Sequence, residues 1–137
     1  MLRITSPSSL LRSALLADAA ASGGMGLLLA IGSSALAPLL GLPEALLLWA
    51  GVALVPFAAC VAWAGTRPDP AAGGLVRPVI AVNYAWVAAS IGLLILSSAA
   101  PTPLGLAFVG AQALAVLMLA IAQSVAVARL RNRAANV

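Results

Sequence analysis

The fold of this chain is decided by its first long apolar stretch, which reads SALLADAAASGGMGLLLAIGSSAL over residues 13–36. Asp18 is the one charged residue in it, and the apolar residues do not alternate with polar ones as they would in a half-buried strand. A helix of about 20 apolar residues crosses the roughly 30 Å hydrocarbon core of a bilayer. Residues 13–36 therefore predict a membrane-spanning helix.

Three further apolar stretches follow, at residues 44–64, 79–98 and 104–128. Helices are expected in each, because lipid offers no hydrogen-bond partner to an unpaired backbone group. Gly41 and Pro43 predict a tight turn after the first stretch, residues 65–78 form a polar loop, and Pro101 breaks the chain before the last stretch. The predicted fold class is an all-α membrane protein with four transmembrane helices packed as two antiparallel hairpins.

The composition excludes a water-soluble globule. Of the 137 residues, 64% are hydrophobic and only 7% are charged, whereas a soluble domain carries about 25% charged residues. The net charge of +4 does not indicate nucleic acid, because the basic residues are dispersed and form no contiguous face for phosphates. The lipid bilayer is the expected partner, and nucleic acid is not.

The basic residues predict the orientation of the chain in the membrane. All seven are arginines, and they lie between or beyond the apolar stretches at Arg3, Arg12, Arg67, Arg77, Arg129, Arg131 and Arg133. The connections at residues 38–44 and 97–103 carry none. Cytoplasmic loops are enriched in arginine and lysine, so both termini and the loop 65–78 are expected in the cytoplasm. The Ala-, Leu-, Gly- and Arg-rich composition without lysine suggests a bacterial source, and hence an inner membrane.

The chain is divided accordingly into three parts. Residues 1–12 are predicted to be a cytoplasmic N-terminal lead, in which Ser6-Pro7-Ser8-Ser9 prevents a continuous helix. Residues 13–128 are the transmembrane domain, and residues 129–137 are a basic cytoplasmic tail. The first span is expected to remain uncleaved, because a secretory signal has a shorter apolar core of about 7–15 residues.

Three polar side chains form a candidate intramembrane site. Asp18 lies about five residues, or ~7 Å, inside the first span; Asn83 lies at a similar depth in the third, and Gln123 at a similar distance before the basic end of the fourth. Carboxylates within membrane helices are uncommon and usually face the bundle interior or water. Three interpretations stay open: a small polar site open to the cytoplasm, interhelical hydrogen bonds that lock the bundle, or an Asp18 that reaches the interface. Gln112, deeper in the fourth span, is expected to bond to a neighbouring helix.

Small residues in the first span predict close helix packing. Ser22 and Gly26 lie one helical turn apart, as do Ala19 and Gly23, and such small residues let helix backbones approach closely. The third span offers a similar pair in Ala88 and Gly92. We therefore expect the first and third spans to pack against each other.

Few residues offer catalytic or metal-binding chemistry. The sequence has no histidine and a single cysteine, Cys60, so neither a metal cluster nor an intramolecular disulfide is expected. Asp18 and Ser22 lie one helical turn apart, but a carboxylate alone activates a serine hydroxyl poorly. Glu44 is the first residue of the second span, where the positive end of the helix dipole favours a negative charge. We expect no cofactor, no metal and no enzymatic activity.

The whole chain resembles the small, uncharacterised four-span integral membrane proteins of proteobacteria. The resemblance rests on Asp18-x3-Ser22-Gly23 in the first span, the Leu42-Pro43 turn, and Asn83-x2-Trp86 in the third span, and it implies no activity. The layout is also similar to that of the small multidrug resistance exporters, in length, span number and an acidic residue in the first span. Those exporters have a glutamate deeper in the membrane and a weak charge bias, whereas this chain has Asp18 and a strong bias.

These features favour a non-catalytic inner-membrane helix bundle that serves as an accessory or scaffold component. The alternative is a small proton- or cation-coupled transporter, or a ligand-binding membrane protein, that uses Asp18. A second copy of the chain or another membrane protein is a compatible partner under either interpretation. A closed hydrogen-bonded environment around Asp18 would favour the first function, and a water-filled cavity reaching it would favour the second.

Overall fold

The first helix begins earlier than predicted because Ser6 caps it. The Oγ of Ser6 accepts a hydrogen bond from the backbone N–H of Ser9 at 3.2 Å. Pro7 then takes the first helical position, where a missing backbone N–H has no cost. The expectation that residues 6–9 prevent a helix is therefore wrong, since serine and proline in this order start one.

The computed structural model describes residues 6–96 and 98–136, which form four helices. These are α1 (Pro7–Leu40), α2 (Glu44–Thr66), α3 (Val76–Leu96) and α4 (Pro103–Ala135). Each is long and apolar enough to cross a membrane, which confirms the predicted all-α fold class. Arg3 of the predicted lead, Ser97 of the predicted third span and Val137 of the predicted tail lie outside the described residues.

The largest remaining differences from the predicted helix boundaries lie at the end of α1, the start of α3 and the end of α4. Helix α1 continues through Pro38 to Leu40 instead of ending at residue 36. Helix α3 starts at Val76 because Pro78 falls in its first turn, where no intrahelical donor is required. Helix α4 continues through the arginine-rich segment to Ala135, so the described part of the predicted tail, through Ala135, is helical.

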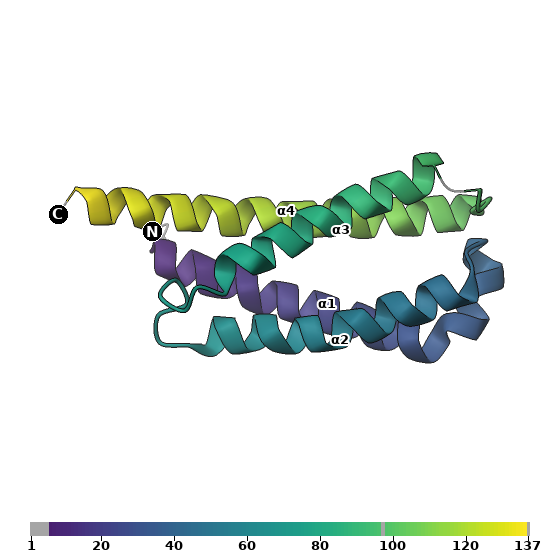
Figure 1. Ribbon diagram of the computed structural model, residues 1–137, viewed down its shortest axis with the longest axis horizontal. Coiled ribbons are helices and arrows are strands. Elements are labelled where there is room, and N and C mark those ends of the chain that lie inside the picture. Colours follow the sequence, from purple (N-terminus) through teal and green to yellow (C-terminus); the bar gives the residue numbers. More distant parts are fainter. Residues whose placement is uncertain (1–5, 97, 137) are drawn as a thin grey trace, which may run out of the picture.

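The helices form a bundle of two hairpins that are joined side by side (Figure 1). Helix α1 packs along α2, α3 packs along α4, and α1 also packs against α4, whereas α2 and α3 scarcely touch. The beginning of α1, the end of α4 and the loop 67–75 lie at one end of the bundle (Figure 1). We call this the arginine end, and the opposite end, with the turns at residues 41–43 and 98–102, the proline end.

A buried stripe along α1 forms the axis of the core. Its members recur every three or four residues, as one face of a helix requires: Leu11, Ala14, Leu15, Asp18, Ser22, Gly26, Leu29 and Ser33. Toward the arginine end this stripe joins an apolar cluster with Val61, Val79 and Ala126. Toward the proline end it joins a second cluster with Leu54 and Val109. The large side chains outside the stripe, such as Ile31 at 80% exposure and Leu96 at 85%, form the apolar exterior.

The glycines of α1 pack against α2, not against α3. A Cβ atom on Gly26 would lie 3.1 Å from the carbonyl oxygen of Gly51 and 3.0 Å from the Cβ of Leu54. Gly51 is tighter still, since a Cβ there would meet the Gly26 oxygen at 2.7 Å and the backbone nitrogen of Ala30. In the described ranges the α1 and α3 backbones make no close approach, and a Cβ on Gly92 would meet nothing within 4 Å. The predicted packing of the first span on the third is wrong, because the short turn after α1 brings α2 alongside it.

The two hairpins are joined at the proline end by Thr102. Its backbone N–H donates to the Leu40 carbonyl at 3.0 Å, and its Oγ1 donates to the Leu39 carbonyl at 2.6 Å. The same Oγ1 accepts from the backbone N–H of Gly105 at 3.1 Å and so caps α4. Thr102 therefore satisfies carbonyls in the last turn of α1 and a donor in the first turn of α4, which are groups that a helix leaves unpaired.

Candidate functional site

Asp18 lies in the middle of the buried stripe of α1 and has no solvent exposure. It is about 16 Å along the helix from Pro7, because α1 starts earlier than the sequence suggested. The side chains packed around Asp18 shield it from solvent at both ends of the bundle. The interpretation in which its side chain reaches the interface is therefore excluded, and its carboxylate must be satisfied by neighbouring helices.

Asn83 and Gln123 supply those partners. The Nδ2 of Asn83 donates to the Oδ2 of Asp18 at 2.6 Å, and the Nε2 of Gln123 donates to the same oxygen at 2.8 Å. Asn83 also donates to the Oε1 of Gln123 at 3.2 Å. Asn83 is 2% exposed and Gln123 is fully buried. The structure thus brings side chains from α1, α3 and α4 into one hydrogen-bonded group.

Ser22 completes the group from within α1. Its Oγ donates to the Oδ1 of Asp18 at 3.0 Å, so both carboxylate oxygens accept hydrogen bonds. We call Asp18, Ser22, Asn83 and Gln123 the aspartate cluster. The sequence predicted Ser22 to be a packing residue, although its position one turn after Asp18 was a signal for this bond.

The aspartate cluster contains no basic side chain. No arginine among residues 6–96 and 98–136 pairs with Asp18, whose partners are one hydroxyl and two amides. An ionised carboxylate is only an acceptor, and three donors face it. No buried side-chain nitrogen or oxygen in the described ranges lacks a partner. The cluster is therefore a fully hydrogen-bonded polar unit inside an apolar bundle.

A second polar group joins α3 to α4 nearer the proline end. The Nε1 of Trp86 donates to the Oε1 of Gln112 at 2.7 Å, and the Nε2 of Gln112 donates to the Oγ of Ser90 at 2.9 Å. Ser90 in turn donates to the Trp86 carbonyl at 2.8 Å. The expectation that Gln112 bonds to a neighbouring helix is confirmed. Its partners Trp86 and Ser90 were not predicted, because tryptophan and serine at helical spacing carry no distinctive signal.

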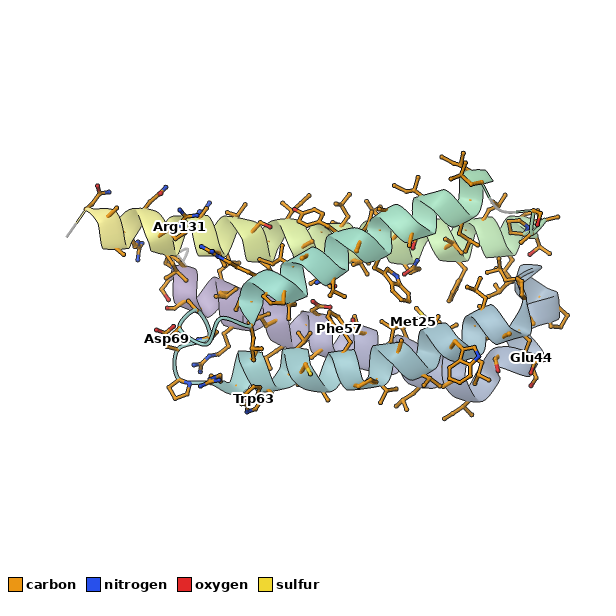
Figure 2. All side chains as sticks on the ribbon, viewed as in Figure 1. Met25, Glu44, Phe57, Trp63, Asp69 and Arg131 are labelled. Atoms are coloured by element: carbon orange, nitrogen blue, oxygen red, sulfur yellow. The ribbon has the colours of Figure 1, made fainter. Side chains whose placement is uncertain are left out.

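A cavity of about 340 Å³ separates the hairpins beside this second group. Trp86, Ser90 and Gln112 form its polar wall. Its apolar wall comes from α1, α2, the 41–43 turn, α3 and α4: Met25, Leu29, Leu42, Leu46, Leu47, Ala50, Ala89, Leu93, Phe108 and Val109. Met25, labelled in Figure 2, belongs to this wall. The cavity lies where α2 and α3 scarcely touch.

A smaller cavity of about 110 Å³ reaches the aspartate cluster itself. Ser22 and Asn83 line it together with Phe57, which Figure 2 labels on α2. Trp86 lines both this cavity and the larger one. Trp86 therefore belongs both to the wall of the large apolar cavity and to the wall of the cavity beside Ser22 and Asn83.

The remaining candidate residues stay apart from the cluster. Gly23 has only ordinary contact with α2, since a Cβ there would lie 3.5 Å from that of Ala58. Cys60 is exposed on α2. Glu44 lies at the proline end (Figure 2), as the first residue of α2. The described residues contain no group of three or more His, Cys, Asp or Glu side chains placed to hold a metal ion.

Comparison with protein-family models, with curated proteins and with solved structures finds no match for this chain.

Proposed function

We propose that this four-span membrane protein is a non-catalytic helix bundle that serves as an accessory or scaffold component of a membrane assembly. The observation that carries the proposal is the closure of the aspartate cluster: Asp18 is fully buried, and both of its oxygens accept from side chains of the bundle. It is the one acidic residue in the interior of a helix, because Glu44 is the first residue of α2 and Asp69 lies in a loop. Its hydrogen-bonding capacity is used to hold three helices together.

The exterior of the bundle supports the same proposal. Large apolar side chains are exposed on every described helix, including Ile31, Trp49, Ile95 and Leu114. In a membrane this surface faces lipid or the helices of a partner. Arginines gathered at one end favour an orientation with both termini in the cytoplasm, and the resemblance noted above favours a bacterial inner membrane.

The test is the Asp18→Asn variant, studied beside the wild type in native mass spectrometry of detergent-extracted complexes. A scaffold needs the hydrogen bonds of residue 18 and not its charge, so the variant should keep the mass and stoichiometry of the wild-type assembly. Loss of a partner from Asp18→Asn at unchanged thermal stability would contradict a purely structural role for the carboxylate.

A second candidate is a small proton- or cation-coupled transporter or ligand-binding protein. It is favoured by the cavity of about 340 Å³ and by the smaller cavity beyond Trp86 that touches Ser22 and Asn83. Under this candidate function, a movement of Trp86, which lines both cavities, joins them. A ligand would then reach the donors of Asp18 from between the hairpins.

Reconstituted vesicles distinguish the two candidates. A pH-sensitive dye trapped inside the vesicles reports proton movement for the wild type, Asp18→Asn and Trp86→Phe. Under the scaffold proposal all three proteins give the same trace as empty vesicles. A proton flux that the wild type shows and Asp18→Asn lacks would replace the scaffold proposal with the coupled one.

A further inference from the structure

The arginine end contains a cavity of about 430 Å³ that the aspartate cluster does not touch. The loop 67–75, the start of α3 and the end of α4 enclose it. Arg77 enters its wall from the first turn of α3, and Arg131 enters from the last turns of α4. Two arginines from different helices therefore line one cavity.

Arg77 and Arg131 differ from the arginines beside them. Arg12 donates to the carbonyls of Arg67 and Pro68 at 2.9 and 3.2 Å. The Arg67 guanidinium lies over the Trp63 ring, 4.9 Å from its centre. Arg77 and Arg131 are exposed and have neither a hydrogen bond nor an ion pair with any residue in 6–96 or 98–136. Their donors are free to bind a ligand.

No aspartate or glutamate among residues 6–96 and 98–136 forms an ion pair with these two arginines. Asp18 is enclosed in the aspartate cluster, and Glu44 lies at the opposite end of the bundle (Figure 2). Asp69 lies at the arginine end, where its Oδ1 accepts from the backbone N–H of Ala71 at 3.0 Å and forms no ion pair among the described residues. The cavity is therefore positively charged and suited to an anion.

The rest of the wall is apolar and continues the inner face of α4. Val127 lies one turn beyond the buried Gln123 on this helix, and Leu130 lies about one turn beyond Val127. Val76 adds an apolar side chain from α3. An inorganic phosphate ion would gain nothing from these groups, whereas a ligand with a charged head and apolar chains would contact both kinds of wall.

We propose that this cavity binds the phosphate headgroup of an anionic phospholipid. Arg77 and Arg131 hold the phosphate, since guanidinium groups form paired, charge-assisted hydrogen bonds with phosphate oxygens. Val76, Val127 and Leu130 contact the glycerol and the first methylenes of the acyl chains. Basic pockets between membrane helices are suited to such headgroups. The site is independent of the proposed function, because it shares no residue with the aspartate cluster or with the cavities beside it.

The test is a titration of the purified full-length protein in detergent with phosphatidylglycerol, followed by native mass spectrometry. The double variant R77Q/R131Q should bind about 25-fold more weakly, since each arginine near an anionic lipid contributes about fivefold. The control R129Q/R133Q has the same net charge but changes arginines that do not line the cavity. It should keep nearly the wild-type affinity, and an equal loss in the two double variants would overturn the proposal.

A further variant and two competitors make the result specific. A72E places a carboxylate on an exposed part of the cavity wall and leaves both arginines present, so it should weaken lipid binding without altering thermal stability. Wild-type affinity in A72E would contradict the assigned position. Inorganic phosphate and phosphatidylcholine should compete poorly. Equal competition by phosphate would indicate a free-anion site, and equal competition by phosphatidylcholine would remove the preference for anionic lipid.

Discussion

Gln123 and Asp18 are separated by 105 positions in the chain, yet the Nε2 of Gln123 donates to the Oδ2 of Asp18 at 2.8 Å. This bond connects the first helix of the bundle to the last. Asn83 donates to the same oxygen from α3, so one carboxylate oxygen fixes the relative positions of three helices. In an apolar bundle, where helix contacts are otherwise interchangeable, such a bond specifies the register.

The aspartate cluster predicts different outcomes for two substitutions of Asp18. In Asp18→Asn the amide oxygen can accept from Asn83 and Gln123, and the amide nitrogen can donate to Ser22, whose hydroxyl also accepts. This variant should unfold in detergent close to the wild-type temperature. Asp18→Leu leaves buried amide donors unpaired and should lose about 2 kcal/mol. Equal stability of the two variants in thermal unfolding would contradict the hydrogen bonds that Asp18 accepts from Asn83 and Gln123.

Replacing Gln123 by glutamate should make the stability of the bundle depend on pH. Gln123→Glu removes a donor and places a second carboxylate against Asp18, and two adjacent buried carboxylates cannot both stay ionised. The folded variant should therefore be least stable at high pH and recover as the pH falls, because protonation of one carboxyl restores a donor. Thermal unfolding across a pH series measures this, with Gln123→Leu as the matched control. A Gln123→Leu variant with the same pH dependence would show that the effect arises elsewhere.

Gly51 should tolerate substitution less well than any glycine of α1. In Gly51→Ala the new methyl group would meet the backbone of α1 at Gly26 and Ala30, and overpacking of this kind costs about 1–3 kcal/mol. Gly24→Ala is the control, because a Cβ there meets nothing within 4 Å. Gly24→Ala should be neutral or slightly stabilising, since alanine favours a helix. Thermal stability in detergent separates the two, and a harmless Gly51→Ala would disprove the close α1–α2 approach.

Thr102 should be needed as a hydrogen-bonding residue at the proline end. Thr102→Val keeps the shape of the side chain but removes the cap of α4 and the bond to the Leu39 carbonyl, at a cost of about 1–2 kcal/mol. Thr102→Ser retains the hydroxyl and should stay near the wild type. The comparison uses unfolding in detergent, where a Thr102→Val variant as stable as the wild type would contradict the role of the hydroxyl.

The arginines predict the topology in the membrane. A reporter fused after Val137 and one inserted at Gly73 should both report the cytoplasm, because cytoplasmic segments carry the basic residues. A reporter inserted in the turn at residues 41–43 should report the opposite side. A periplasmic signal from Gly73 would contradict the assigned orientation.

The apolar runs were long enough to predict every described helix, but not where each one ends. Ser6 and Pro7 have the composition of a loop, but in the structure Ser6 caps a helix whose first residue is Pro7. The similar depth of Asp18, Asn83 and Gln123 in their spans could be predicted by counting residues from the span ends. Which atoms donate to which depends on helix rotation, and the sequence alone does not determine it. The functional role of these three residues stays a prediction.

The choice of packing partner for α1 was the larger error. Small residues recur in every span, so Ser22 and Gly26 did not distinguish α2 from α3. Gly51 of α2 distinguishes the two helices, because a glycine on each helix, Gly26 and Gly51, permits contact between the backbones. The junction at Thr102 and the cavity beside Trp86 also escaped prediction. Both arise where segments far apart in sequence meet, and no local pattern records them.

The long separation between Asp18 and Gln123 has a consequence for biogenesis. The ribosome delivers α1 to the membrane first and the donor half of α4 last, so the Asp18 carboxylate must wait for its final partner until almost the whole chain has been made. During that interval the residue has only Ser22 and, later, Asn83 to replace its hydration. Release of α1 into lipid should therefore be delayed until α4 has arrived, and nascent chains truncated before Gln123 should remain beside the insertion machinery longer than those that include it.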